Sequence, residues 1–341
     1  MRHRLLIFLL LTIASLHCGS SIFYSNVGFI NMQAYEGGQE RMPFQSRALM
    51  MPVMRWARQN ALLKRRATHT NDIDVAGAAR ERQTPERLLS SLIARICVLG
   101  LGILATLEGK RLGIKPWWLP WAVVLEILFV CYVARSAGQD YWYPYDFPQF
   151  LLFGVGSVLV LRRKWVPLLL MMPVMAANRE TSIFLALLWF AAEWGEANRW
   201  RVITQSVALG TAWLLVQIYI YHLFKHNMSV IGNRFPANLM RLTVPTTWPQ
   251  ILSAFGFLWP FLWLYRKLLS PRHLRILYAM VPCCAVVLWF GIWTETRIFG
   301  EFTLLSAIFA AEMWTCSQAV ITSPAHLKSY GRREQQVQAL P

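Results

Sequence analysis

The chain has 341 residues, of which 56% are hydrophobic and only 15% are charged. Several apolar runs approach the roughly 20 residues that a helix needs to cross a bilayer, and a soluble protein would need several very long buried helices to hide them. The formal net charge of +17 would suggest nucleic acid as a partner of a soluble protein. Much of this charge lies in short loops between apolar runs, where the positive-inside rule explains part of it. We therefore predict an all-α, polytopic integral membrane protein that contacts membrane lipids and no nucleic acid.

The N-terminal segment, residues 1–23, is predicted to be a retained membrane anchor. Basic residues at positions 2–4 precede an apolar run that begins at Leu5, and no A-x-A cleavage site follows this run. We expect the N-terminus to lie in the cytoplasm.

Residues 24–88 form a polar segment that we predict to be an extracytoplasmic loop. Within it, residues 47–58 place apolar side chains on one face of a helix and arginines on the other. This pattern suits a helix that lies at the membrane surface, and a solvated helix fits nearly as well. The charged stretch from Lys64 to Arg87 is expected to be flexible.

Residues 89–316 are predicted to form a multi-span domain, which gives the whole chain about nine or ten spanning or half-spanning helices. Continuous spans are expected at 89–107, 116–134, 147–161, 202–223, 249–265, 276–293 and 298–316. Basic loops at residues 110–115, 162–164 and 266–275 predict which end is cytoplasmic. The tail, residues 317–341, is expected on the same side.

The apolar stretch 165–193 must begin and end on the cytoplasmic side if the flanking basic loops are cytoplasmic. This predicts two short helices with a turn near Arg179, because each half is too short to cross a bilayer alone. We expect Thr181 and Ser182 to satisfy backbone groups that the turn leaves free. The alternative is one long span, which would invert the orientation of everything upstream.

Three polar islands interrupt this apolar chain, at residues 36–47, 178–180 and 295–301. A charged side chain at the bilayer centre costs about 2.5–3.5 kcal/mol on insertion scales. The charges of these islands should therefore be shielded by protein, by water, by each other or by a ligand. We expect the islands to converge at one membrane face, together with Asp146. The alternative is that they are helix-end charges without a shared role.

Arginine and carboxylate side chains in one such site suggest two kinds of chemistry. Guanidinium groups suit phosphate oxygens because they are planar, always charged and able to form two parallel hydrogen bonds. Carboxylates suit metal binding or general-base activation of a hydroxyl group. The combination fits an enzyme that handles a lipid-linked phosphate, and it also fits ion pairs that only join helices.

The cysteines and histidines predict neither a zinc site nor a disulfide framework. The six cysteines lie almost all within or beside apolar runs, and the chain has no CxxC motif and no His/Cys metal spacing,. We expect no metal ligands and no cofactor, and the sequence leaves open whether the reaction needs a divalent metal.

Three motifs give the chain a resemblance to uncharacterised bacterial multi-span membrane proteins: residues 43–52 (PFQSRALMMP), 178–181 (NRET) and 295–301 (ETRIFGE). Those proteins in turn resemble the GT-C superfamily of glycosyltransferases. The resemblance implies a GT-C-like layout and transfer of a sugar from a polyprenyl-phosphate donor at the extracytoplasmic face of a bacterial inner membrane. The family pattern places a catalytic Asp in the first outer loop, where this chain offers Glu36 and Glu40.

Under this hypothesis, Glu36 or Glu40 takes a proton from the acceptor hydroxyl. The other predicted site residues bind the substrate and are Arg47, Asp146, Arg179, Glu180, Glu295, Arg297 and Glu301. Among them, the three arginines hold the departing lipid phosphate, and Glu180 and Glu301 orient the arginines. Two alternatives stay open. A transporter or lipid flippase fits because transporters use broken helices with buried charge, and a non-catalytic scaffold of an envelope-polymer assembly is the other.

Overall fold

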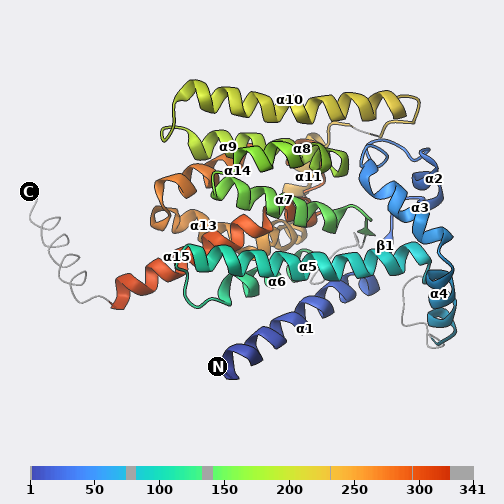
Figure 1. Cartoon of the computed structure of the whole chain (residues 1–341), viewed down its shortest axis with the longest axis horizontal. Helices are drawn as coiled ribbons and strands as arrows, with labels where there is room; N and C mark the ends of the chain where they lie inside the picture. Colours follow the sequence, from blue (N-terminus) through green and yellow to red (C-terminus); the bar gives the residue numbers. More distant parts are fainter. Residues whose placement is uncertain (1, 74–81, 133–140, 231, 294, 323–341) are drawn as a thin grey trace, which may run out of the picture.

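A computed structural model describes residues 2–73, 82–132, 141–230, 232–293 and 295–322 (Figure 1). Helices make up nearly all the regular structure of these residues. The strands among them are β1 (Val27–Gly28) and β2 (Tyr141–Trp142), which pair in parallel. The predicted all-α class is confirmed. The part of the predicted tail beyond residue 322 lies outside the described residues.

In the part of the chain that the structure describes, five helical segments are long and apolar enough to cross a membrane. Four belong to α1 (Arg2–Ser25), α5 (Pro85–Arg111), α10 (Arg199–Phe224) and α14 (Pro271–Phe290), and the fifth joins the 3-10 helix η6 (Thr296–Phe302) to most of α15 (Thr303–Thr322). Three shorter apolar helices accompany them, namely α6 (Leu119–Tyr132), α7 (Asp146–Leu161) and α8 (Trp165–Asn178). Their lengths and composition suit the membrane-protein class that the sequence predicts.

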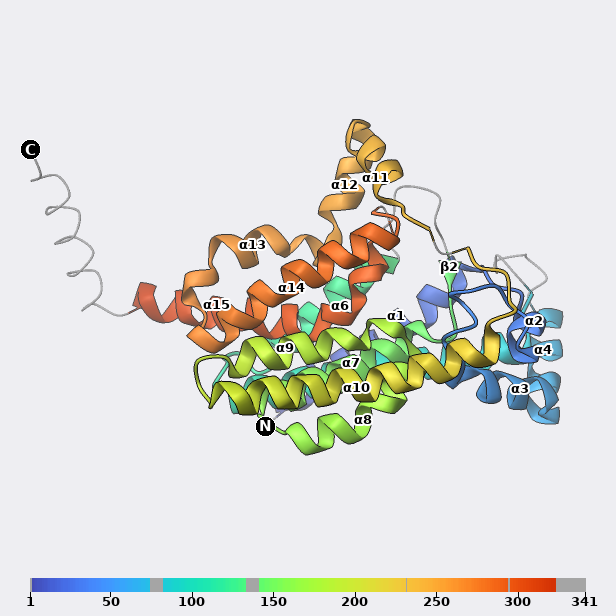
Figure 2. The same cartoon turned by 90° about the horizontal axis from the view of Figure 1, so that it is seen from above.

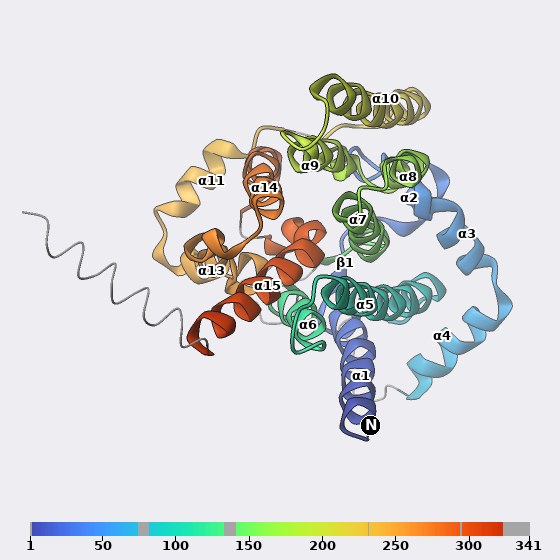
Figure 3. The same cartoon turned by 60° about the vertical axis from the view of Figure 1, so that its left-hand side comes forward.

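The helices pack around a centre that contains α5, α7 and α15, with α1 against α5 (Figure 3). The most apolar stretch of α15 is 83% buried, whereas that of α10 is only 11% buried. α10 therefore lies at the edge, where it covers α8 and α9 (Phe184–Glu193). Its outward apolar side chains, such as Leu215 and Ile218, are exposed and suit contact with lipid.

Residues 165–193 form the two short helices that the charge pattern predicts. Trp165 at the start of α8 donates a hydrogen bond to the Gln205 carbonyl at 3.4 Å, and Trp189 near the end of α9 donates to the Gln205 side chain at 3.2 Å. Since both ends of the stretch meet the same residue of α10, α8 and α9 leave and return to one end of the helix assembly. The backbone breaks at Arg179, which is extended (φ −161°, ψ 140°).

Two side chains of α10 satisfy carbonyl groups that this break leaves free. Gln217 donates to the Ala176 carbonyl at 2.8 Å, and Trp213 donates to the Glu180 carbonyl at 2.7 Å. We expected Thr181 and Ser182 to satisfy these carbonyl groups, and this expectation is wrong. Among the described residues the Ser182 hydroxyl has no hydrogen-bond partner, and Thr181 donates to Glu301 instead. A polar side chain in a neighbouring apolar helix can thus replace a local cap.

The first loop contains more helix than expected: α2 (Met32–Gly37), η1 (Ala48–Met50), α3 (Met51–Gln59) and α4 (Ala61–Ile73). α3 is the predicted amphipathic helix, with Met54 and Ala57 buried. The expectation of a flexible stretch from residue 64 is wrong up to Ile73, because α4 covers it, and residues 74–81 lie outside the described residues. α5 begins at Pro85, since the Thr84 side chain caps its first turn,.

The span predicted at 249–265 is wrong as a continuous helix. It consists of α12 (Trp248–Leu252), η4 (Ala254–Phe257) and α13 (Trp259–Leu264). Phe255, Gly256 and Phe257 have positive φ angles of 56°, 62° and 62°, which stop an α-helix. A Cβ atom at Gly256 would lie 2.3 Å from the Glu126 carboxylate, so the break lets this segment approach α6 closely. Together with α11 (Phe235–Leu242), α12 projects from one side of the molecule (Figure 2).

Candidate functional site

Arg47 of the first polar island meets the second and third islands in one place, at the end of α7 where Asp146 begins the helix. The loop before η1 contributes Arg47, the break between α8 and α9 contributes Arg179 and Glu180, and η6 (Thr296–Phe302) with its preceding residue contributes the rest. We call this group the arginine network, and it consists of Arg47, Asp146, Arg179, Glu180, Glu295, Arg297 and Glu301. All seven residues predicted to bind substrate are members.

Asp146 is the hub of the network. Its carboxylate lies 3.0 Å from Nη1 of Arg297 and 3.6 Å from Nη1 of Arg179, and it accepts a hydrogen bond from the Tyr132 hydroxyl at 3.2 Å. Arg297 also reaches Glu295 at 2.9 Å. The position of Asp146 in the first turn of α7 favours its negative charge through the helix dipole.

Arg179 has the least complete set of partners. Its guanidinium is buried between two carboxylates, with Nε 3.4 Å from Glu301 and Nη1 3.6 Å from Asp146. Within the described residues its side chain forms no hydrogen bond, and its Nε has no hydrogen-bond partner. Thr181 donates to one oxygen of Glu301, and the other oxygen is buried without a hydrogen-bond partner in the described part of the chain. Buried polar groups without partners cost free energy, which makes Arg179 the weak point of the network.

Arg47 and Glu180 form the open edge of the network. Arg47 binds Glu180 with two parallel contacts, 2.7 Å from Nη2 and 3.2 Å from Nε. The Glu180 side chain is 34% exposed, whereas the Arg47 side chain is 11% exposed. The Arg47 guanidinium also stacks 4.7 Å from the ring centre of Tyr145. Glu180 is thus the member of this pair that a molecule outside the protein can reach.

The aromatic stretch before α7 supplies members of the site that the sequence analysis missed. Tyr143 lies under Arg297, with 4.3 Å between the guanidinium carbon and the ring centre. Asn178 donates to the Tyr145 carbonyl at 3.0 Å and to Gln149 at 3.1 Å. The signal in the sequence was the run of tyrosines directly before Asp146. Aromatic faces stabilise buried arginines through cation–π contacts.

Glu36 and Glu40, the two carboxylates predicted to act as the catalytic base, lie outside the network. Glu36 lies 3.0 Å from Arg58, which also binds Glu86 at 2.6 Å. Burial raises the pKa of Glu36 to about 7 although Arg58 opposes the shift. Glu40 accepts hydrogen bonds from the backbone amides of Asn31 at 2.8 Å and of Arg41 at 3.1 Å. Both acids contact the first loop itself, so the structure does not bring them to the arginines.

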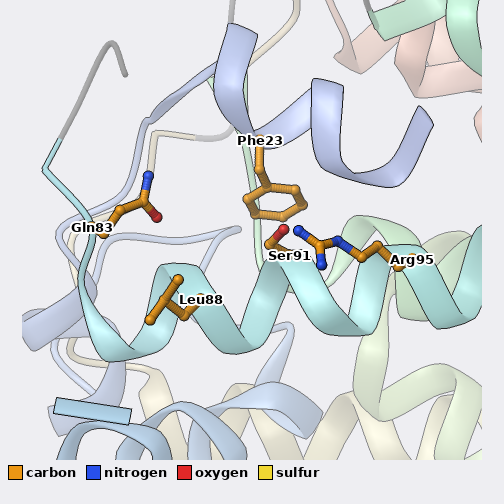
Figure 4. Close-up of a pocket in the computed structure, with 5 residues that line it drawn as sticks. All are labelled: Phe23, Gln83, Leu88, Ser91 and Arg95. Carbon is orange, nitrogen blue, oxygen red and sulfur yellow. The ribbon is translucent and has the colours of Figure 1, made fainter. Parts of the chain in front are cut away.

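The described residues hold no cluster of metal ligands, and two cavities among them lie apart from the arginine network. No group of three or more His, Cys, Asp or Glu side chains in the described ranges is placed to hold a metal ion. One cavity, of about 100 Å³, lies between α1 and α5 beside Phe23 and Arg95 (Figure 4). A larger one, of about 520 Å³, lies near the N-terminus of α1. Neither of these two cavities borders the arginine network.

No protein-family model matches this chain, and no curated protein and no solved structure is significantly similar to it. The assignment of function therefore depends on the arrangement of the side chains alone.

Proposed function

We propose that the chain is a bacterial inner-membrane protein that binds a polyprenyl-phosphate-linked sugar at the arginine network and transfers the sugar at the extracytoplasmic face. The orientation rests on α7. Its end at Arg162 belongs to the basic loops, and its start at Asp146 belongs to the network. The 16 residues of α7 separate the two regions by about 24 Å. With the basic loops and both termini in the cytoplasm, the network lies toward the other face.

Arg179 is the observation that carries this proposal. Three arginines from three distant segments meet, and one of them is buried with no hydrogen bond among the described residues. A phosphate group offers several oxygen acceptors that match the planar donors of a guanidinium. In the proposal, the phosphate of the lipid carrier binds Arg179, with Arg47 and Arg297 beside it, and the four carboxylates hold these arginines in place.

The chemistry of the proposed transfer is a direct displacement at the anomeric carbon. The acceptor hydroxyl oxygen attacks that carbon, the bond from the carbon to the phosphate oxygen breaks, and the phosphate leaves with the electron pair. A carboxylate takes the hydroxyl proton. Because Glu36 and Glu40 lie outside the network, we assign this role to Glu180, whose side chain is the most exposed of the network's four carboxylates. The arginines stabilise the negative charge that grows on the phosphate.

The binding step is tested by the thermal stability of the full-length protein in detergent, with polyprenyl phosphate or with the uncharged polyprenol. A ligand at a hundredfold excess over its Kd stabilises the folded state by about 2.7 kcal/mol. We expect polyprenyl phosphate to raise the melting temperature of the wild type, and Arg179→Gln to lose this rise. Arg275→Gln is the matched control, because Arg275 binds Glu196 at the basic end. An equal rise in Arg179→Gln would contradict the proposal.

A transporter or lipid flippase is the second candidate, because the break between α8 and α9 places charged residues between two half-length helices,. Transfer of a labelled sugar separates the two. Glu180→Gln should abolish transfer and keep the ligand-induced rise in melting temperature if the chain is a transferase. Lipid binding without sugar transfer in the wild type would favour the flippase, and absence of binding would favour the scaffold.

A further inference from the structure

A wedge-shaped groove opens between α1 and α5 toward the N-terminus of α1. The two helices touch at Gly19, where an added Cβ atom would lie 2.8 Å from the backbone of Arg95. From this contact they diverge (Figure 1), and the space between them is a cavity of about 520 Å³. This volume lies within the range of about 300–1,000 Å³ that is typical of ligand pockets.

Trp121 of α6 forms the inner wall of the groove and is fixed on two sides. Its indole nitrogen donates to the Ser15 hydroxyl of α1 at 2.9 Å. Gly102 of α5 makes room for the ring, since a Cβ atom there would lie 2.0 Å from the same nitrogen. The groove is therefore a consequence of two glycines and one tryptophan, and its walls are held by packing and a hydrogen bond.

The sides of the groove are apolar and face outward. Phe8 of α1 and Ile103 and Leu107 of α5 line it, and their side chains are 43%, 38% and 50% exposed. Because both α1 and α5 are long and apolar enough to span a membrane, these side chains face the hydrocarbon of a surrounding bilayer. An extended hydrocarbon chain matches the shape and polarity of this surface.

The mouth of the groove is basic and lacks acidic partners. Arg4 and Lys110 line it, and within the described residues neither forms an ion pair. Lys110 lies 5.5 Å from the ring centre of Trp117, which also lines the groove. The adjacent Arg111 is different, because it binds Glu108 at 2.7 Å. Two unpaired cations above an apolar channel complement a molecule with an anionic head and an apolar tail.

A buried hydroxyl provides a further polar group in the same groove. Thr106 lines it and is 6% exposed, and its Oγ1 has no hydrogen-bond partner within the ranges that the structure describes. A helical threonine usually donates to the carbonyl one turn earlier, as Thr12 does with Phe8 at 2.9 Å. The free hydroxyl of Thr106 lies within the stretch of α5 between Ile103 and Lys110, where the glycerol ester of a bound lipid would lie.

From this geometry we infer that the groove between α1, α5 and α6 binds one anionic phospholipid. Its phosphate lies between Arg4 and Lys110, its ester group beside Thr106 and one acyl chain along Phe8, Ile103 and Leu107. The site lies at the basic end of the molecule, away from the arginine network, so it does not depend on the proposed transfer. The basic end faces the cytoplasmic leaflet, where the anionic surface potential attracts basic segments.

The inference is tested by native mass spectrometry of the full-length protein in detergent, titrated with dioleoyl phosphatidylglycerol or dioleoyl phosphatidylcholine. We expect the first phosphatidylglycerol to bind about tenfold more tightly than the first phosphatidylcholine, because two basic residues attract its headgroup. The double substitution Arg4→Gln with Lys110→Gln should remove this preference. The matched control is Lys164→Gln with Arg201→Gln, which removes two exposed charges from the same end and should keep the preference.

A second variant tests the apolar part of the site. Leu107 is half exposed, so Leu107→Trp should fill the groove without disturbing the core. We expect this variant to keep the melting temperature of the wild type and to lose the first phosphatidylglycerol. Equal losses in the control pair would overturn the inference, because they would show a diffuse effect of surface charge. Unchanged binding in Leu107→Trp, or equal affinity of the wild type for both lipids, would overturn it as well.

Discussion

The two ends of the helix assembly use the same residue types in different ways. At the basic end, Glu108, Glu193 and Glu196 bind arginines from the loops and from the adjoining helix ends. Several arginines of this end are 41–50% exposed, namely Arg111, Arg162 and Arg163. In the arginine network, the arginine side chains are only 6–11% exposed. An ion pair costs little to form in water and much to bury. The same type of ion pair therefore costs little free energy at the basic end and much more in the arginine network.

The buried arginine of the basic end, Arg272, is paired more fully than Arg179, although its Nε also has no hydrogen-bond partner among the described residues. Arg272 donates to the carbonyls of Val160 and Leu161 at 2.7 and 2.8 Å and to Glu193 at 2.6 Å. It thereby joins the start of α14 to the ends of α7 and α9. Arg179 is equally buried, and the described residues give it two longer ion pairs and no side-chain hydrogen bond. Burial of charge with incomplete pairing is more typical of a functional site than of a structural joint.

The largest expected effect is the removal of Arg297. Arg297→Met leaves Asp146 and Glu295 without this arginine, and breaking one partner of a buried ion pair costs about 3–5 kcal/mol. We expect a large drop in the midpoint of unfolding in detergent. The double variant Asp146→Asn with Arg297→Met should be more stable than Arg297→Met alone, because it removes one of the uncompensated charges. If the unfolding midpoint of Arg297→Met fell no further than that of Arg163→Gln, the buried and the exposed ion pairs would contribute equally to stability, which would contradict the prediction.

Much of the fold could be predicted because apolar length and loop charge are local properties of the sequence. The long helices and the two-helix stretch 165–193 followed from them. The break at residues 255–257 could not be predicted, since phenylalanine does not favour a positive φ angle. It arises where Gly256 meets Glu126 of α6, a tertiary contact that no local pattern encodes. The helix α4 was missed because its charged residues were interpreted as solvated chain.

The site could be predicted as a group but not as a set of partners. Charges in apolar surroundings must be compensated, and this rule alone brought the seven residues together. The choice of partner depends on the packing of distant segments. Arg47 binds Glu180, 133 residues away, and Asp146 is shared by two arginines. Glu36 and Glu40 were selected because they lie in the first loop, and sequence position could not show that Arg58 and backbone amides are their partners.

The ion pairs of Glu36 and Glu86 are intermediate in burial between those of the two ends. Both carboxylates are buried, but the Arg58 side chain that they share is 37% exposed. Burial raises the pKa of Glu36 from about 4.5 to about 7. The folded state therefore holds a proton that the unfolded state releases, and its stabilising contribution is full below pH 4.5 and is lost as the pH rises through 7. A shift of this size corresponds to about 3 kcal/mol.

We expect the wild type to lose thermal stability between pH 5 and pH 8 relative to Glu36→Gln, whose amide keeps its neutral state throughout. The measurement is the difference in melting temperature between the two proteins at each pH, which cancels the titration of groups that they share. A difference that does not change with pH would show that Glu36 is ionised in the folded protein across this range. The acid would then resemble the paired carboxylates of the basic end.

The smallest expected effect is that of Arg163→Gln at the basic end. Arg163 binds Glu196 and lies 3.7 Å from Glu193, but its side chain is 50% exposed. Exposed ion pairs contribute about 0–1 kcal/mol, and salt screens them. In low salt, the melting temperature of Arg163→Gln should be slightly below that of the wild type. In 0.5 M NaCl the two should match, because the screening length there is roughly half its value in 0.1 M salt. Arg297→Met should stay destabilised at both salt concentrations, because salt screens the buried carboxylates of Asp146 and Glu295 little. If salt reversed both losses alike, water would reach the arginine network as freely as the loops, and burial would not explain the difference between the two ends.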